Sequence, residues 1–209
     1  MLKVINGIYV TECMTFPRCG HTWLTRILKY YFDDHLNYCE MYNNPELMID
    51  VNENTNFQKN HDINLETKIK NDRKYLIQIR NREDCLDSYF KLEMMNFDSN
   101  YDVNTNLNYE KNKFINKFNG QKKISDPSLY LNWIEEKKLF YNFFINKWVF
   151  NYIPNSRLVI YENLKHNTFD EVFSILKFMT DNPINEEKLN ESINKSNLKH
   201  NSKNPFELL

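Results

Sequence analysis

The ten residues from 15 to 24, Thr-Phe-Pro-Arg-Cys-Gly-His-Thr-Trp-Leu, constrain the fold of this chain more than any other stretch. A β-branched run at residues 8–11 precedes them, and apolar residues spaced by three and four positions follow within 27–32. This order predicts a strand, a tight loop and a helix. Pro17 fixes one backbone angle and Gly20 tolerates angles that other residues avoid, so the loop can turn sharply.

The helix after this loop would present the amides of residues 20–23 at its N-terminus. Unpaired N–H groups and the helix dipole attract anions there, and Arg18 adds a full positive charge. The sequence therefore predicts a loop that binds phosphate or sulfate. The Walker pattern, in which a glycine-rich loop ends in Gly-Lys-Ser/Thr, is absent, so the loop of an ordinary kinase or ATPase is not indicated.

Four segments, in the same order along the chain, resemble the motifs of PAPS-dependent sulfotransferases. Residues 15–24 resemble the family's 5′-phosphosulfate loop, Thr-Tyr-Pro-Lys-Ser-Gly-Thr-Thr-Trp, and residues 59–61 match its Lys-x-His. Residues 77–90 resemble its 3′-phosphate motif, in which an Arg ends a strand and a Ser follows eight positions later. Residues 158–164 resemble the strand and Tyr-Glu-Asp-Leu segment that closes the nucleotide site. Together the matches span residues 8–180.

The resemblance implies a sulfuryl-transfer site with His61, Lys59 and Arg18 as its catalytic residues. His61 would take the proton of the acceptor, because an imidazole titrates near neutrality. Lys59 would contact the sulfonate. Arg18 stands in place of the family's loop lysine and would stabilise charge on the phosphosulfate, although an arginine cannot give up its proton.

The resemblance also implies which residues bind the nucleotide. They are Arg18, Cys19, Gly20, His21, Thr22, Trp23, Arg80, Ser88 and Tyr161. Arg80 and Ser88 would bind the 3′-phosphate, Trp23 would stack on the adenine, and Tyr161 would contact its edge. The amides of residues 20–22 and the Thr22 hydroxyl would hold the 5′ group.

Several positions depart from the family's pattern. Cys19 stands where a Ser is usual, and His21 stands where a Thr is usual, which makes His21 a second, weaker candidate for a site histidine. Arg82 replaces a proline of the 3′-phosphate motif, and the Arg-Lys-Gly segment of the cytosolic members is missing from the tail. Whether Lys199 and Lys203 replace that segment stays open.

The pattern of the whole chain predicts an α/β fold with a central parallel sheet flanked by helices. Strands are expected at 8–15, 75–79 and 157–161, and helices at 22–34, after 80, at 125–149, at 168–178 and at 186–198. Residues 33–62 are expected to be irregular. The resemblance implies a P-loop nucleotide-kinase-like sulfotransferase fold, with one domain over residues 1–209 and a variable polar insertion around 92–126 near the acceptor pocket.

Composition narrows the class of partner. A formal charge of −1 and a pI near 6.5 argue against a nucleic-acid binder. No apolar run approaches the length of a membrane span and no signal-peptide pattern is present, so a cytoplasmic enzyme is expected. The four cysteines lack paired metal-ligand spacing and are expected to be free thiols.

The function that these features favour is transfer of the sulfonate of PAPS to a hydroxyl or amine of a small molecule, glycan or lipid, with PAP as the product nucleotide and no metal. Two alternatives stay open: a P-loop-type kinase that uses ATP, and a non-catalytic relative that binds a nucleotide. The sequence leaves the identity of the acceptor and the oligomeric state open.

Overall fold

The computed structural model describes residues 1–41, 53–98 and 127–201. The chain divides into two compact units, one made of residues 1–80 and 144–209 and the other of residues 81–143. Among the residues described, no helix is both long enough and apolar enough to cross a membrane.

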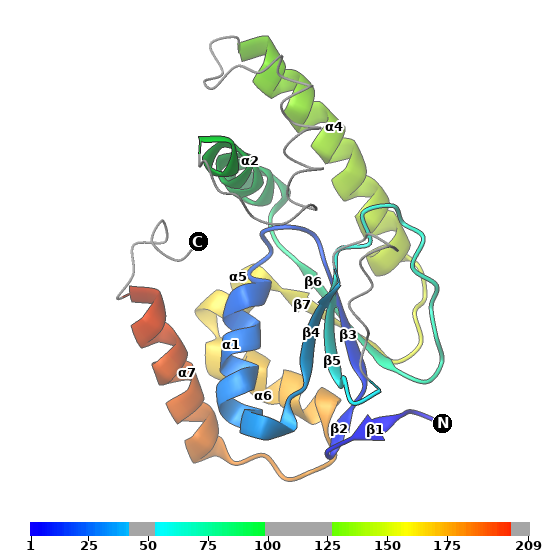
Figure 1. The fold of residues 1–209 in the computed structure, drawn as a ribbon, viewed down its shortest axis with the longest axis vertical. Helices are drawn as coiled ribbons and strands as arrows, with labels where there is room; N and C mark the ends of the chain where they lie inside the picture. The colour runs from blue at the N-terminus through cyan, green and yellow to red at the C-terminus, as the bar shows by residue number, and fades with distance from the viewer. Residues whose placement is uncertain (42–52, 99–126, 202–209) are drawn as a thin grey trace. The chain divides into compact units, whose positions relative to one another are not determined.

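A five-stranded, fully parallel sheet forms the centre of the first unit (Figure 1). Its strands are β3 (Thr11–Thr15), β4 (Tyr38–Met41), β5 (Phe57–Asn60), β6 (Lys74–Ile79) and β7 (Ser156–Ile160). Their order across the sheet is β4-β5-β3-β6-β7. The predicted parallel α/β sheet is therefore confirmed. The expected strand at 8–15 is interrupted, because β2 (Ile8–Tyr9) pairs with β1 (Val4–Ile5) in a separate hairpin.

The expectation that residues 33–62 are irregular was wrong, because β4 and β5 lie within this range. Both strands are only four residues long, Tyr-Cys-Glu-Met and Phe-Gln-Lys-Asn, and neither shows the apolar run of a buried parallel strand. The register pairs Met14 with Asn60 and Glu40 with Lys59. Polar residues of β4 and β5 consequently stand at the carboxyl edge of the sheet beside the end of β3.

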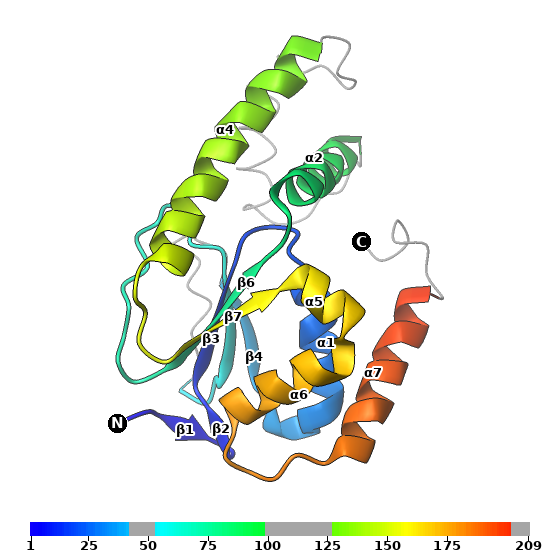
Figure 2. The ribbon, with the colours of Figure 1, turned by 180° about the vertical axis from the view of Figure 1, so that it is seen from behind.

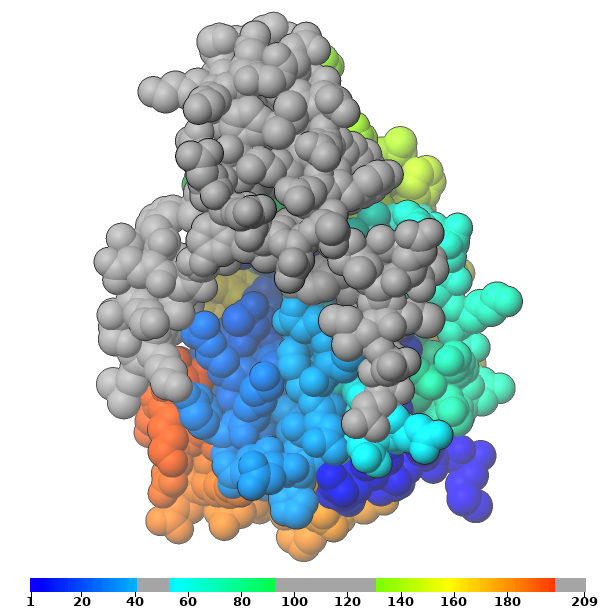
Figure 3. Space-filling model, in the orientation of Figure 1, coloured from blue at the N-terminus to red at the C-terminus, as the bar shows by residue number. Residues whose placement is uncertain are grey.

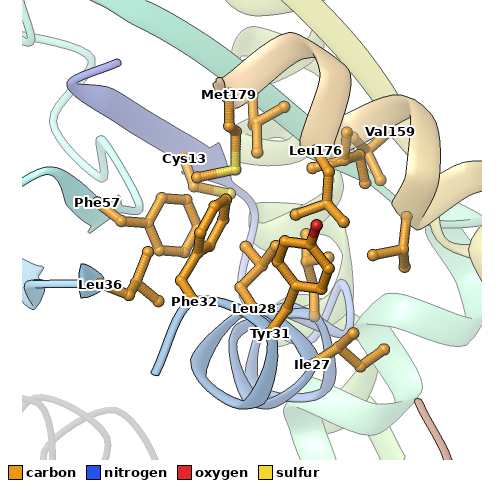
Figure 4. Close-up of a cluster of buried hydrophobic side chains, with 14 of the residues drawn as sticks. Cys13, Ile27, Leu28, Tyr31, Phe32, Leu36, Phe57, Val159, Leu176 and Met179 are labelled. Carbon is orange, nitrogen blue, oxygen red and sulfur yellow. The ribbon is translucent and has the colours of Figure 1, made fainter. Parts of the chain in front are cut away.

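One face of the sheet is covered by α1 (His21–Phe32), α6 (Thr168–Met179) and α7 (Glu186–Asn201). Figure 4 shows side chains of α1 and α6 meeting Cys13, Phe57 and Val159 from three strands. Helices α1 and α7 pack side by side, as the space-filling view also shows (Figure 3). Helix α5 (Tyr161–His166) continues directly from β7 (Figure 2).

The opposite face of the sheet is covered by residues 144–150, which end α4 (Pro127–Ile145) and form the π-helix η3 (Asn146–Phe150). Phe144 packs edge-on against Phe16 with 6.0 Å between ring centroids, and Trp148 lies 5.7 Å from the ring of Tyr75. All four rings are almost fully buried. Helices therefore flank both faces of the sheet, as the sequence predicted.

The second unit contains α2 (Arg82–Asp98) and most of α4. Trp133 of α4 is 1% exposed, and its ring meets Tyr89 and Phe90 of α2 at centroid distances of 5.6 and 5.2 Å. These aromatic contacts give the unit its own small core. The expected insertion around 92–126 falls largely outside the described residues.

Candidate functional site

The loop between β3 and α1 has the backbone of a sharp turn. Arg18 and Gly20 both have positive φ angles, 72° and 84°. The amides of Trp23 and Leu24 both donate to the Gly20 carbonyl, at 3.1 and 3.3 Å, and so begin the hydrogen bonds of α1. The amides of residues 21 and 22 precede these two. In the first turn of a helix, the N–H groups have no carbonyl acceptor within the helix. This N-terminus has the geometry of an anion site.

Tyr161, the first residue of α5, lies directly against this loop. A Cβ atom added at Gly20 would stand 2.4 Å from Cδ2 of the Tyr161 ring, far inside van der Waals contact. Two independent features therefore require glycine at position 20: the left-handed backbone conformation and the closeness of the aromatic ring. The structure brings together two predicted nucleotide residues that are 141 positions apart.

Arg80 joins the same cluster from the end of β6. Its guanidinium lies 4.7 Å from the centroid of the Tyr161 ring, within cation–π range. Its Nη1 donates to the carbonyl of Arg18 at 3.3 Å. Arg80, Arg18, Gly20 and Tyr161 thus meet at one edge of the sheet. Ser88, the predicted partner of Arg80, is a half-buried residue of α2 in the second unit.

His61 follows β5 and is fixed against the end of β3. Its Nδ1 lies 2.6 Å from the carbonyl oxygen of Thr15, so Nδ1 carries the proton and donates it. The other ring nitrogen, Nε2, is then the acceptor. Burial and, after it, the charge of Lys59 lower the pKa of His61 to about 4. At neutral pH the ring is uncharged and able to accept a proton.

Lys59 lies at the carboxyl end of β5, with a side chain that is 12% exposed. Burial lowers its pKa, while the nearby carboxylate of Glu40 opposes this shift. Lys59 Nζ is 3.8 Å from Glu40 Oε2, and the Tyr38 hydroxyl donates to Glu40 Oε1 at 2.8 Å. Sequence reasoning missed Glu40, because its four-residue strand carries no periodic signal. The β-forming residue Tyr38 was the available hint.

The side chain of His21 does not point outward from the loop. It is 5% exposed and stacks on the ring of Phe57, and its Nε2 lies 3.1 Å from the Tyr38 hydroxyl and 2.9 Å from the Thr25 hydroxyl. Burial, followed by the charge of Lys59, lowers the pKa of His21 well below its usual range. Its imidazole is part of the core beneath the loop, which leaves its backbone amide for the predicted anion contact.

The remaining predicted nucleotide residues surround the N-terminal turn of α1. Cys19 is buried, whereas Arg18 and Thr22 are exposed. Trp23 is half-buried, and its indole N–H donates to Asn197 Oδ1 of α7 at 3.2 Å. Across the described ranges, no group of three or more His, Cys, Asp or Glu side chains is arranged to hold a metal ion.

We expect the stability of the fold to decrease as the pH falls below 6.5. The pKa of His61 is lowered from 6.5 to about 4 and that of His21 is also lowered, so between these values the unfolded chain binds more protons than the folded one. Stability is then retained above pH 6.5 and lost toward pH 4. Urea unfolding at pH 7 and pH 5 measures this change.

The matched variants for that measurement are His61→Gln and His35→Gln, since His35 is an exposed residue of η1 (Asp33–His35). His61→Gln should lose part of the pH dependence, and His35→Gln should keep all of it. An unaltered pH dependence in His61→Gln would contradict the burial of a neutral imidazole at this position.

Comparison with solved structures shows what this architecture resembles. The chain matches the crystal structure of mouse sulfotransferase SULT7A1 complexed with PAP, with a TM-score of 0.50 over 97% of this chain and 68% of that one. This chain has a sulfotransferase-like fold. Sequence identity in the match is 12%, so the likeness concerns the fold. A scan of protein-family models found no match, and neither did a search of curated proteins.

Within this sulfotransferase-like fold, the predicted residues of the first unit follow the carboxyl ends of four neighbouring strands. The loop at 16–20 follows β3, His61 follows β5, Arg80 follows β6, and Tyr161 follows β7. Ligands of open parallel sheets bind at this edge. The recognition of the fold from sequence is therefore confirmed, while the role of each residue stays a prediction.

Proposed function

We propose that this protein is a PAPS-dependent sulfotransferase, in which residues 1–209 act as one functional domain. The observation that carries the proposal is the grouping, at one sheet edge, of the N-terminus of α1 with three cations and a neutral histidine. The cations are Arg18, Lys59 and Arg80, and the histidine is His61. A site that both binds a polyanion and accepts a proton suits sulfuryl transfer.

The residues fit the reacting groups of this chemistry. PAPS would supply the sulfonate, whose sulfur forms a bond to the acceptor oxygen or nitrogen as its bond to the 5′-phosphate oxygen breaks. His61 Nε2 would take the proton that the acceptor loses. Arg18 and Lys59 would stabilise the negative charge on the sulfonate and on the departing 5′-phosphate oxygen. No net oxidation or reduction occurs, and no metal is needed for these steps.

The nucleotide would bind across the same edge. The amides of residues 20–22, with the Thr22 hydroxyl and the tight turn at Cys19, would hold the 5′ group. Arg80 would bind the 3′-phosphate, while Trp23 would stack on the adenine and Tyr161 would contact its edge. The role of Ser88, which belongs to the second unit, stays a prediction. The mouse sulfotransferase of similar fold contains PAP, which supports PAP as the first nucleotide to test.

The alternatives make different predictions. A kinase would need ATP with a divalent metal, so turnover that survives EDTA would favour PAPS chemistry over ATP chemistry. A non-catalytic nucleotide binder would need neither Lys59 nor His61. The acceptor stays unidentified, and a screen of hydroxyl- and amine-bearing small molecules, glycans and lipids with ³⁵S-labelled PAPS would identify its class.

The decisive experiment is calorimetric titration with PAP and with AMP, in the wild type and in Arg80→Ala. PAP should bind more tightly than AMP, and Arg80→Ala should weaken PAP binding about 10- to 100-fold, because charge-assisted hydrogen bonds to a phosphate contribute roughly 1.5–3 kcal/mol. AMP binding should change little in this variant.

Arg157→Ala is the matched control for that titration. Arg157 lies near the start of β7 and pairs with Glu171 on α6, away from the carboxyl edge of the sheet. Its removal should leave PAP affinity unchanged. Equal affinity of the wild type for PAP and AMP would contradict a 3′-phosphate site and would favour the kinase alternative.

A further inference from the structure

The buried carboxylate of Asp62 stabilises the turn that follows His61. Asp62 is 1% exposed. Its Oδ1 accepts the backbone N–H of Thr67 at 2.8 Å, and its Oδ2 accepts both Lys147 Nζ at 2.6 Å and Trp148 Nε1 at 2.8 Å. Three donors, one five residues away in the chain and two 85 and 86 residues away, therefore converge on the residue next to the proposed base.

Lys147, a residue of the π-helix η3, contacts this turn through its side chain. Its ammonium also donates to the carbonyls of Leu65 and Thr67, at 2.8 and 2.9 Å. With Asp62 Oδ2 as the third acceptor, all three N–H groups of the ammonium are satisfied. The side chain of Lys147 thus binds the turn at three points, across separations of 80 to 85 residues.

The backbone of this turn is held in an unfavourable conformation. Asp62 and Leu65 have φ angles of 44° and 57°, in the left-handed region that residues other than glycine rarely occupy. The Leu65 N–H donates to the Asp62 carbonyl at 2.9 Å. Such strain costs of order 1–3 kcal/mol per residue and persists only where neighbouring contacts impose it.

The residue on the other side of His61 is also fixed. Asn60 is fully buried; its Oδ1 accepts the Asp62 N–H at 2.8 Å, and its Nδ2 donates to Glu12 Oε1 at 2.7 Å and to Thr67 Oγ1 at 3.0 Å. His61 is therefore placed between two buried residues whose polar side chains are hydrogen-bonded. Its ring has one orientation, with Nδ1 on the Thr15 carbonyl.

We propose that Asp62, through its buried ion pair with Lys147, is a positioning residue that holds His61 with Nδ1 on the Thr15 carbonyl and Nε2 as the proton acceptor. A buried ion pair adds little net stability, because removing both charges from water offsets most of their attraction. Its contribution here is geometric: it fixes one strained turn and hence one orientation of the imidazole. The catalytic part of this inference rests on the proposed function.

Asp62→Asn is the primary test. The asparagine keeps Oδ1 as the acceptor for the Thr67 amide. Its Nδ2 cannot accept a hydrogen bond, so the turn loses its hydrogen bonds from Lys147 and Trp148 to residue 62. We expect kcat to fall about 10- to 100-fold, as displacement of a catalytic group by about 1 Å does. The KM for PAPS and the Kd for PAP should stay within twofold of the wild type, because Asp62 is not part of the anion loop.

Lys147→Met is the second variant, and it removes the cation while keeping a side chain of similar length. The matched control is the exposed ion pair of Asp33 and Lys188, whose charged atoms are 2.8 Å apart. Asp33→Asn and Lys188→Met should leave kcat unchanged. Circular dichroism and thermal melting of every variant separate loss of the fold from loss of positioning.

A direct readout that does not need activity is the tautomer of His61, measured by ¹⁵N NMR of the imidazole. The wild type should show one tautomer with the proton on Nδ1, and folded Asp62→Asn or Lys147→Met should show a mixture. Wild-type kcat and a single Nδ1–H tautomer in a folded variant would overturn the proposal. So would unfolding of both variants, because the pair would then serve the fold alone.

The two readouts distinguish failure of this inference from failure of the proposed function. If the wild type transfers no sulfonate to any acceptor, the proposed function fails, and the tautomer measurement still decides whether Asp62 and Lys147 orient His61. If the wild type is active but Asp62→Asn retains its kcat and its tautomer, only the positioning role fails.

Discussion

Gly20→Ala is expected to weaken PAP binding at least 100-fold. A Cβ atom at this position meets the Tyr161 ring at 2.4 Å, and the backbone has a φ angle of 84°. The ring contacts the Arg80 guanidinium, which also donates to the Arg18 carbonyl, so a shift of the ring or of the loop backbone disturbs the residues that precede α1. The amides of the proposed anion site then lose their alignment. Calorimetric titration with PAP measures the effect.

Gly7→Ala is the matched control for this substitution. Gly7 also has a positive φ angle, 75°, but its added Cβ would meet the end of the Asn182 side chain at 2.8 Å, in the turn between β1 and β2. Asn182 is exposed and can rotate away. We expect Gly7→Ala to lower stability by about 1 kcal/mol and to bind PAP normally. Wild-type affinity in Gly20→Ala would refute the proposed loop.

His61→Ala is expected to reduce turnover 100- to 10,000-fold while PAP binding stays intact. A positioned general base contributes a factor of this size. The ring is neutral at pH 7, because its pKa is lowered to about 4, and its Nδ1 is occupied by the Thr15 carbonyl. Single-turnover measurement of ³⁵S transfer from PAPS to an acceptor found in the screen reports the chemical step.

His35→Ala is the control, because His35 is exposed on η1 and none of the proposed roles involves it. It should transfer sulfonate at the wild-type rate. Unchanged turnover in His61→Ala would exclude His61 as the base and would direct attention to Glu40, the carboxylate beside Lys59. Loss of PAP binding in His61→Ala would instead indicate that the histidine supports the loop.

The sequence correctly predicted the elements that are stabilised by interactions between residues close together in the chain. The strand before residue 15, the glycine turn and the helix after it follow from β-branched residues, a φ-tolerant glycine and helical spacing, and the structure has this order. The apolar run at 75–79 predicted β6, which spans Lys74–Ile79. The order of the motifs also led to the fold, which the match to the mouse sulfotransferase supports.

The short strands β4 and β5 were invisible to the same reasoning. A four-residue strand is too short to show a recognisable side-chain pattern, and pairing with a neighbouring strand stabilises it instead: β5 pairs with β3, and β4 pairs with β5. Glu40 was missed for this reason. For His21, its place in the predicted anion loop suggested that its side chain was a weaker candidate for a site histidine. In the structure its ring instead stacks on the rings of Phe57 and Tyr38.

The sequence by itself indicated the fold class, and short motifs within it predicted the loop at 15–24 and the candidates His61, Arg80 and Tyr161, whose roles stay predictions. Only the tertiary structure decided that Tyr161 restricts position 20 and that Lys147 neutralises Asp62 beside His61. Those contacts join residues 141 and 85 positions apart. Hydrogen bonds and close packing act over a few ångströms in space. The helical connections between parallel strands bring residues that are far apart in the chain within this range, and a local sequence pattern does not predict such contacts.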